Sequence, residues 1–432
     1  MEKRDINIKR MSSVVGLDLS YLFANGFWIT LRYGVVAVLG LLFTIGFARL
    51  GSRELFGQYQ FVLSLAALFS VLSLPGLNTA ALRSISVGGS ISVVRQTIRW
   101  SFFSSLLAFP GIIGYGVYRH FFLHDLSFDM MMAIVASAAL FPFFYAPNTW
   151  YAAYEGRTLF MPVAIRTILS TGFVVGILLV SLLFHANLLF LVIMYFGINA
   201  LFSWYFSSEI FRREKAEDAL GVKKGDVDIR YGFAVTLQKF AYGLSENVPP
   251  LLISFFFGFG FLAIFQIASF FINTVSGLLT ALSSMYLPKL FSGEKLEHKK
   301  IILQNVIVGL FSYAALAFLL RTVFLLFYGS GYSESQTLAW ILAPLIIISP
   351  LRIYLLNFFT ARGSSVFIVT SFIAANLLGA SLFFCIKGAY PIFGVAAYIY
   401  SLHISTLLFF LAKYAYFLCE NNTLCAKNSP VS

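Results

Sequence analysis

Apolar segments of roughly 20 residues or more, the length that crosses a hydrocarbon core as a helix, follow one another along almost the whole chain. Only 11% of the 432 residues are charged, whereas a soluble domain carries about 25%. We therefore expect an all-α membrane protein with about twelve transmembrane helices. The candidate spans are 22–48, 57–80, 98–119, 129–150, 161–184, 188–208, 231–257, 262–287, 301–327, 336–360, 365–387 and 392–418.

Lysine and arginine are concentrated in alternate connections between these spans, and both tails fall on the basic side. Cytoplasmic loops carry an excess of these residues, so we expect both termini in the cytoplasm. The basic side holds Arg83, Arg95, Arg99, Arg157, Arg212, Arg213, Lys215, Lys223, Lys224, Arg230, Lys289, Lys295, Lys299, Lys300 and Arg362. The opposite side holds Arg49, Arg53, Arg119 and Lys387.

The longest polar connection, 209–229, leaves six spans on each side. It is either an ordinary loop or a linker between two related halves. Weak similarity between 56–60 and 262–266, which open the second and eighth spans, favours the second interpretation. We expect an N-terminal lobe over 1–208, a cytoplasmic linker over 209–229 and a C-terminal lobe over 230–432. Secondary transporters often have such duplicated halves, with the substrate path between them.

Composition and motifs exclude several classes of protein. The net charge of +12 sits mostly between spans, which indicates topology signals and contact with anionic lipids rather than nucleic acid. No phosphate-binding Gly-rich loop of an ATPase is present. The three cysteines are scattered, and His120 and His124 have no third ligand in the pattern, so we expect no metal site and no resident cofactor. We expect a carrier rather than an enzyme.

Ionisable residues inside the spans are the candidate substrate-binding groups. A charged side chain at membrane depth is costly, so it should face protein or water. Arg32 and Lys239 lie deep in spans 1 and 7, while Arg166 and Arg352 lie where snorkelling to the headgroups is an alternative. A cationic lining selects anionic cargo, and guanidinium groups suit phosphate. We predict a cationic cleft formed by Arg32, Lys239, Arg352 and Arg166.

The seventh span carries an acidic residue, Glu246, shortly before Pro249 and Pro250. Two prolines remove backbone donors, so we expect a kink or break there and a hinge at these prolines. The alternative is a static kink with Glu246 paired to Lys239. Glu246 and His403 of the last span are the candidate groups for a coupling ion, H⁺ or Na⁺.

Four stretches carry a family resemblance. Residues 48–59 contain Ala-Arg, Leu-Gly and Phe-Gly-x-Tyr in the order of the signature that follows the first span of Wzx-type polysaccharide repeat-unit flippases, with one extra residue between Gly51 and Phe56. Supporting matches lie at 75–83, 154–157 and 326–332. The chain thus resembles this family of the MATE-like (MOP) superfamily over nearly its whole length.

The resemblance implies two six-helix lobes in a V, with spans 1, 2, 7 and 8 lining the cleft. It implies an undecaprenyl-diphosphate-linked oligosaccharide as cargo, flipped across a bacterial inner membrane by alternating access for O-antigen, capsule or exopolysaccharide synthesis. Partners implied are membrane lipids, a polysaccharide polymerase and a chain-length regulator. Two alternatives stay open: an ion-coupled drug or metabolite exporter of the same fold, and a membrane-embedded glycan polymerase or ligase.

Overall fold

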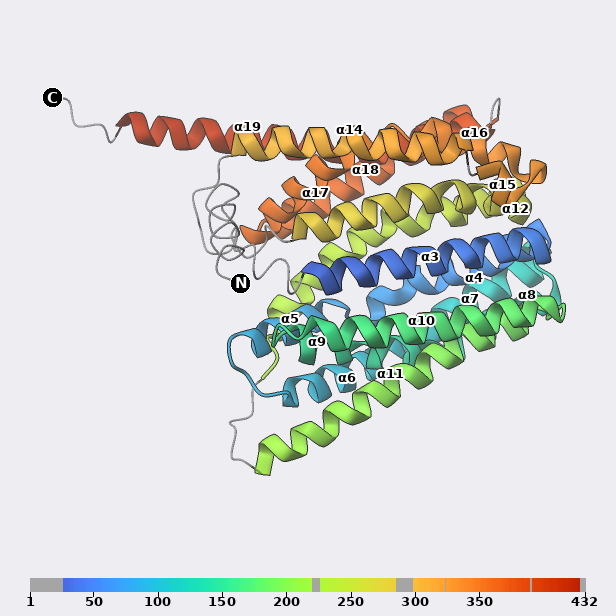
Figure 1. The fold of residues 1–432 in the computed structure, drawn as a ribbon, viewed down its shortest axis with the longest axis horizontal. Coiled ribbons are helices and arrows are strands. Elements are labelled where there is room, and N and C mark those ends of the chain that lie inside the picture. Colours follow the sequence, from blue (N-terminus) through green and yellow to red (C-terminus); the bar gives the residue numbers. More distant parts are fainter. Residues whose placement is uncertain (1–25, 220–225, 285–297, 323, 389–390, 428–432) are drawn as a thin grey trace, which may run out of the picture. The chain divides into compact units, whose positions relative to one another are not determined.

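The computed structural model describes residues 26–219, 226–284, 298–322, 324–388 and 391–427, and this part of the chain contains helices and no strand (Figure 1). Ten of its helices are long and apolar enough to cross a membrane, and a bent pair, Ser330–Leu342 with Leu345–Ala361, makes an eleventh candidate span. The predicted all-α membrane fold is confirmed.

Helix α12 accounts for the remaining crossing. It spans Ile229–Ser284, 56 residues, which at 1.5 Å per residue is about 84 Å, more than twice the hydrocarbon thickness of about 30 Å. Its backbone leaves the helical region at Gly258, where φ is 81°. Glycine adopts this conformation readily because it has no Cβ. We call 229–257 the first arm of α12 and 259–284 the second arm.

Contacts divide the chain into two compact units, 1–236 and 237–432, here the N-terminal unit and the C-terminal unit. In the N-terminal unit α3 packs on α10, and α8 packs on α11. Its helices are α3 (Phe27–Leu50), α4 (Arg53–Phe69), α5 (Gly76–Ser86), α6 (Ser92–Ser105), α7 (Ala108–Val117), α8 (Phe128–Tyr145), α9 (Trp150–Glu155), α10 (Phe160–Leu183) and α11 (Leu188–Ala219).

Two spans of this unit are interrupted rather than continuous. The second ends its regular helix at Phe69, and Leu74 takes up a left-handed conformation before Pro75 and α5. The fourth is interrupted by a short 3₁₀ segment at Ala146–Thr149. The hydroxyl of Thr149 donates a 2.6 Å hydrogen bond to Asn78 Oδ1, which ties the two interruptions together.

The C-terminal unit contains most of α12 together with α14 (His298–Thr322), α15 (Phe324–Tyr328), α16 (Ser333–Leu342), α17 (Leu345–Ala361), α18 (Ser365–Ile386) and α19 (Pro391–Lys427). Helix α18 packs along α19, while α17 contacts α14 and α19. A core of aromatic rings, including Phe358, Phe372 and Phe410, fills the space among α17, α18 and α19.

The boundary between the units falls within α12, after Thr236, so the first turns of this helix belong to the N-terminal unit. The close approach of Gly76 to Gly232 and Thr236 attaches these first turns of α12 to the N-terminal unit. A Cβ at Gly76 would collide with the backbone of both residues. The Gly76 N–H donates a 2.9 Å hydrogen bond to Thr236 Oγ1, and the same hydroxyl donates to the Gly232 carbonyl at 2.9 Å.

We expect Thr236→Val to destabilise the protein, because it leaves the buried Gly76 N–H without an acceptor. A buried unsatisfied donor costs about 1–3 kcal/mol. Thr236→Ser keeps the hydroxyl and is the matched control. Thermal unfolding of both purified variants checks this: the valine variant should melt at a lower temperature than the serine variant, and equal melting temperatures would contradict the role of this bond.

Candidate functional site: a polar cavity of the C-terminal unit

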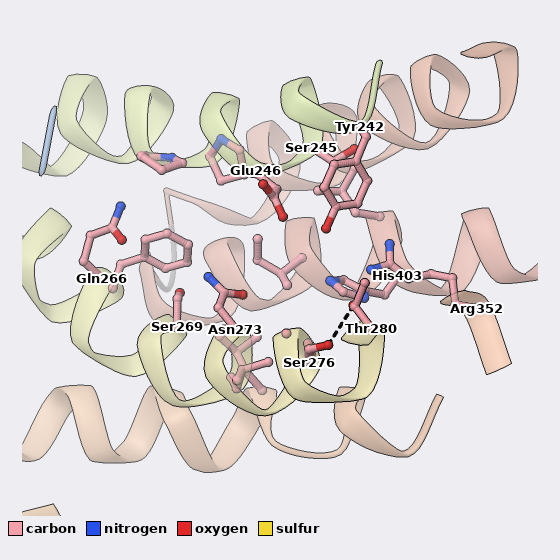
Figure 2. A pocket seen from close by; sticks show the side chains of 18 residues that line it. Tyr242, Ser245, Glu246, Gln266, Ser269, Asn273, Ser276, Thr280, Arg352 and His403 are labelled. Carbon is pink, nitrogen blue, oxygen red and sulfur yellow. Dashed lines mark hydrogen bonds between the residues drawn. The ribbon is translucent and has the colours of Figure 1, made fainter. Parts of the chain in front are cut away.

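A cavity of ≈ 190 Å³ lies within the C-terminal unit, and we call it the C-unit cavity (Figure 2). Both arms of α12 line it, together with residues of α16, α17 and α19. Three residues predicted from the sequence as functional, Glu246, Arg352 and His403, meet here although they come from three different helices. The cavity is therefore the candidate site.

Helical periodicity explains how α12 lines this space. Tyr242, Ser245 and Glu246 lie on the first arm at spacings of three and four, which places them on one helix face. On the second arm, the polar residues that line the cavity recur at spacings of three and four: Gln266, Ser269, Asn273, Ser276 and Thr280. A polar stripe in a membrane helix should face protein or water rather than lipid. Figure 2 shows Glu246 on one side of the cavity and Asn273 on the other.

The polar residues of the second arm were not predicted as site residues. The signal that identifies them is the three–four spacing itself, which is present in the sequence of the eighth span. It is inconspicuous because these polar residues carry no charge and the apolar residues between them keep the mean hydropathy of the span high. Tyr242 was also missed, since a tyrosine in an aromatic-rich chain is usually a packing residue.

The charged groups of the C-unit cavity are not directly paired. Arg352 is only 9% exposed, and its electrostatic neighbours are Tyr242, Glu246 and His403. Among the described residues neither Arg352 nor Glu246 forms an ion pair within 4 Å. The alternative of a Glu246–Lys239 pair is therefore not seen. A buried guanidinium and a carboxylate thus line the same cavity without forming an ion pair.

Several buried polar atoms of the cavity also lack a protein partner. Arg352 Nε, His403 Nδ1 and Ser276 Oγ have none among the described residues. Buried polar groups in proteins are nearly always hydrogen-bonded, so each such atom needs an explanation. These three atoms come from α17, α19 and α12, and all three residues line the same space. A hydrogen-bonding species bound in this cavity would satisfy all three atoms.

The prolines of the first arm leave carbonyl acceptors beside the cavity. The backbone stays helical through Pro249 and Pro250, and the break at Gly258 falls in the connection expected between the seventh and eighth spans. Proline has no N–H, so the carbonyl groups of Ser245 and Glu246 receive no helical hydrogen bond. Both residues line the cavity.

Arg32, the first predicted cleft cation, lies in the N-terminal unit beside an acidic residue. Its Nη1 contacts Glu155 Oε1 of α9 at 2.8 Å, and the two side chains are 20% and 17% exposed. Glu155 belongs to the stretch 154–157 that carries part of the family resemblance, but its pairing with Arg32 was not predicted. The two residues are 123 positions apart, and no local pattern links them.

Arg166 is held in place by a second acidic residue. Its Nη2 contacts Glu209 Oε2 at 2.6 Å, and its guanidinium lies 4.4 Å from the centre of the Tyr154 ring. Glu209 also accepts from Arg213 at 2.8 Å and from the Tyr154 hydroxyl at 3.3 Å. The linker predicted over 209–229 therefore begins with a residue that joins α11 to α9 and α10.

Lys239 lies on the first arm of α12 and does not line the C-unit cavity. Its neighbour Gln238 hydrogen-bonds Ser365, the first residue of α18. Lys239 therefore lies near the first residue of α18. Its side chain is exposed.

Comparison with solved structures identifies the fold of this chain. The solved structures that resemble it include an inward-facing MATE family multidrug resistance transporter of the MOP superfamily, with a TM-score of 0.59 and 16% identity over 93% of this chain and 99% of that one. An outward-facing structure of such a transporter has a TM-score of 0.60 and 14% identity over 94% and 96%. A MOP superfamily transporter from Pyrococcus furiosus has the same four values. These likenesses show the fold.

No curated protein matches the chain in sequence. The family model of the polysaccharide biosynthesis proteins, in contrast, matches residues 22–294, well over half of the chain. The match runs from the first span through both arms of α12 and so includes Arg32, Glu155 and Glu246. This chain is a multi-pass membrane protein with the MATE-like fold of the MOP superfamily, and it belongs to the polysaccharide biosynthesis protein family.

Proposed function

We propose that this protein is a flippase that moves undecaprenyl-diphosphate-linked oligosaccharide repeat units across a bacterial inner membrane by alternating access. The observation that carries the proposal is the match to the polysaccharide biosynthesis protein family. A multi-span protein engaged in polysaccharide biosynthesis is suited to moving a sugar intermediate that is anchored in the membrane by its lipid. Structures of similar fold exist in inward-facing and outward-facing forms, which supports alternating access. The fold and the family favour transport over catalysis.

In this proposal the cationic side chains receive the diphosphate. Arg32 offers a bidentate fork that suits a phosphate group, and Lys239 offers a point charge. Arg166 acts as a fixed structural cation, since Glu209 and Tyr154 hold its guanidinium. Arg352 contacts the cargo from inside the C-unit cavity. The lipid tail stays in the bilayer throughout.

Coupling to an ion gradient is assigned to the C-unit cavity. Glu246 provides the carboxylate for H⁺ or Na⁺, and the carbonyl groups freed by Pro249 and Pro250 add acceptors beside it. His403 is the second candidate for a proton. Movement at the proline pair would change the position of Glu246 relative to Arg352. In this proposal both termini lie in the cytoplasm. The flipped unit then passes to a polymerase and its chain-length regulator.

The direct test is transport by the purified protein in proteoliposomes. The probe is a fluorescent polyprenyl-diphosphate oligosaccharide placed in one leaflet, and its arrival in the other leaflet is read with a sugar-specific lectin. We expect movement that depends on the protein and on an imposed H⁺ or Na⁺ gradient. In cells, deletion of the gene should leave complete units facing the cytoplasm. Normal glycan export by the deletion strain, or efflux of drugs in place of lipid-linked sugar, would contradict the proposal.

A further inference from the structure

The described lining of the C-unit cavity has balanced charge, unlike the cationic lining expected for a phosphate site. Arg352 contributes a positive charge and Glu246 a negative one, and no other Lys, Arg, Asp or Glu lines the cavity in the part of the chain that the structure describes. An anion drawn to Arg352 would meet the Glu246 carboxylate in the same space, since each of the two groups lies within the electrostatic reach of the other. A phosphate therefore gains little here, and a neutral ligand that hydrogen-bonds both groups fits better.

The remaining lining supplies both kinds of contact that a sugar ring uses. Aromatic rings of Tyr242 and Phe265 offer apolar faces, while Asn273, Gln266 and Ser276 offer donors and acceptors. Small-molecule sites combine an apolar wall with a few placed polar groups in this way. The volume of ≈ 190 Å³ is that of about six water molecules at about 30 Å³ each. This is room for one sugar ring rather than for an oligosaccharide.

We infer that the C-unit cavity binds a single uncharged sugar ring of the cargo, with its hydroxyl groups joined to Arg352, to Glu246 on the first arm of α12 and to polar residues of the second arm. The inference rests on the proposed function for the identity of the cargo as a glycan. It adds that the protein recognises one sugar inside the C-terminal unit, separately from the diphosphate. The atoms without partners are the donor Arg352 Nε together with His403 Nδ1 and Ser276 Oγ, each of which can donate or accept, and hydroxyl groups of the ring would satisfy all three.

Gly277 allows the cavity to be filled without disturbing the helix. It lines the cavity, and a Cβ built on it meets no atom within 4 Å. Gly277→Leu therefore projects a side chain into open space, where it competes with the ligand. Gly176 of α10 also has no atom within 4 Å of an added Cβ, and it belongs to the other unit. Gly176→Leu is the matched control.

Saturation-transfer NMR on the purified full-length protein tests the inference. The probes are the methyl glycosides of glucose, galactose, N-acetylglucosamine and glucuronic acid, together with inorganic phosphate as a competitor. We expect a signal for at least one neutral glycoside that phosphate does not displace. Gly277→Leu should lose this signal and Gly176→Leu should keep it. Asn273→Leu, at an exposed lining position, provides a second variant if Gly277→Leu does not fold.

Three outcomes would overturn the inference. One is the absence of any glycoside signal with the unmodified protein, which would leave the cavity to water. Another is binding of the glucuronide alone, which would make the cavity an anion site. The third is undiminished binding by both Gly277→Leu and Asn273→Leu. Failure of the proposed function gives a different result, because the unmodified protein would then bind the glycoside without moving lipid-linked sugar in proteoliposomes.

Discussion

Replacing Arg32 by glutamine should strongly reduce export of the surface polysaccharide while Glu155→Gln preserves it. The structure pairs the two side chains at 2.8 Å, so removal of either one breaks the same contact. They differ in what is left, because only Glu155→Gln retains the guanidinium that the diphosphate needs. A hydrogen bond to a charged group contributes about 1.5–3 kcal/mol, and 1.4 kcal/mol is tenfold in binding. We therefore expect flipping by Arg32→Gln to fall by about tenfold or more.

The measurements are the rate of flipping in proteoliposomes, surface polysaccharide in cells and protein abundance by immunoblot. The double variant Arg32→Glu with Glu155→Arg is the decisive control, because it restores the ion pair with its direction reversed. If the pair is only a structural contact, both single variants should fail to the same degree and the exchanged pair should recover activity. Such a result would remove Arg32 from the proposed substrate path.

The spans of this protein were predictable because the bilayer imposes a length and a composition on each one. Interruptions within a span were harder to place. The connection between the seventh and eighth spans was expected after residue 257, and α12 leaves the helical region at Gly258. Pro249 and Pro250 carry the strongest local signal for a break inside the seventh span, yet the backbone stays helical through them. A proline in a helix removes one hydrogen bond, whereas a reversal of direction needs a backbone conformation that glycine supplies.

Pairing between distant residues could not be predicted from the sequence, for a different reason. The cost of a charge at membrane depth singled out Arg32, Arg352, Glu246 and His403 individually. It did not indicate that Arg32 would contact Glu155, or that the other three would share a cavity. Those contacts depend on which helices pack together, and no periodicity within one helix carries that information.

The two unpaired charges of the C-unit cavity allow their structural and functional roles to be separated. Arg352→Gln leaves the Glu246 carboxylate without a nearby cation, and Glu246→Gln leaves the buried guanidinium without an anion. A buried charge left without compensation destabilises a protein. The effect should be smaller here than for a broken ion pair, because Arg352 and Glu246 are not in direct contact and Glu246 is exposed to the cavity. Each single variant should therefore melt at a lower temperature and lose transport.

The double variant Arg352→Gln with Glu246→Gln removes both charges and keeps hydrogen-bonding side chains of similar size. It should regain most of the lost thermal stability, because no uncompensated charge stays buried. Transport should stay absent, since the carboxylate that takes the coupling ion and the guanidinium that contacts the cargo are both gone. Thermal unfolding and proteoliposome flipping on the same preparations measure the two effects independently. Recovery of ion-coupled flipping by the double variant would show that these charges only stabilise the fold, and the coupling site would then have to lie outside the cavity.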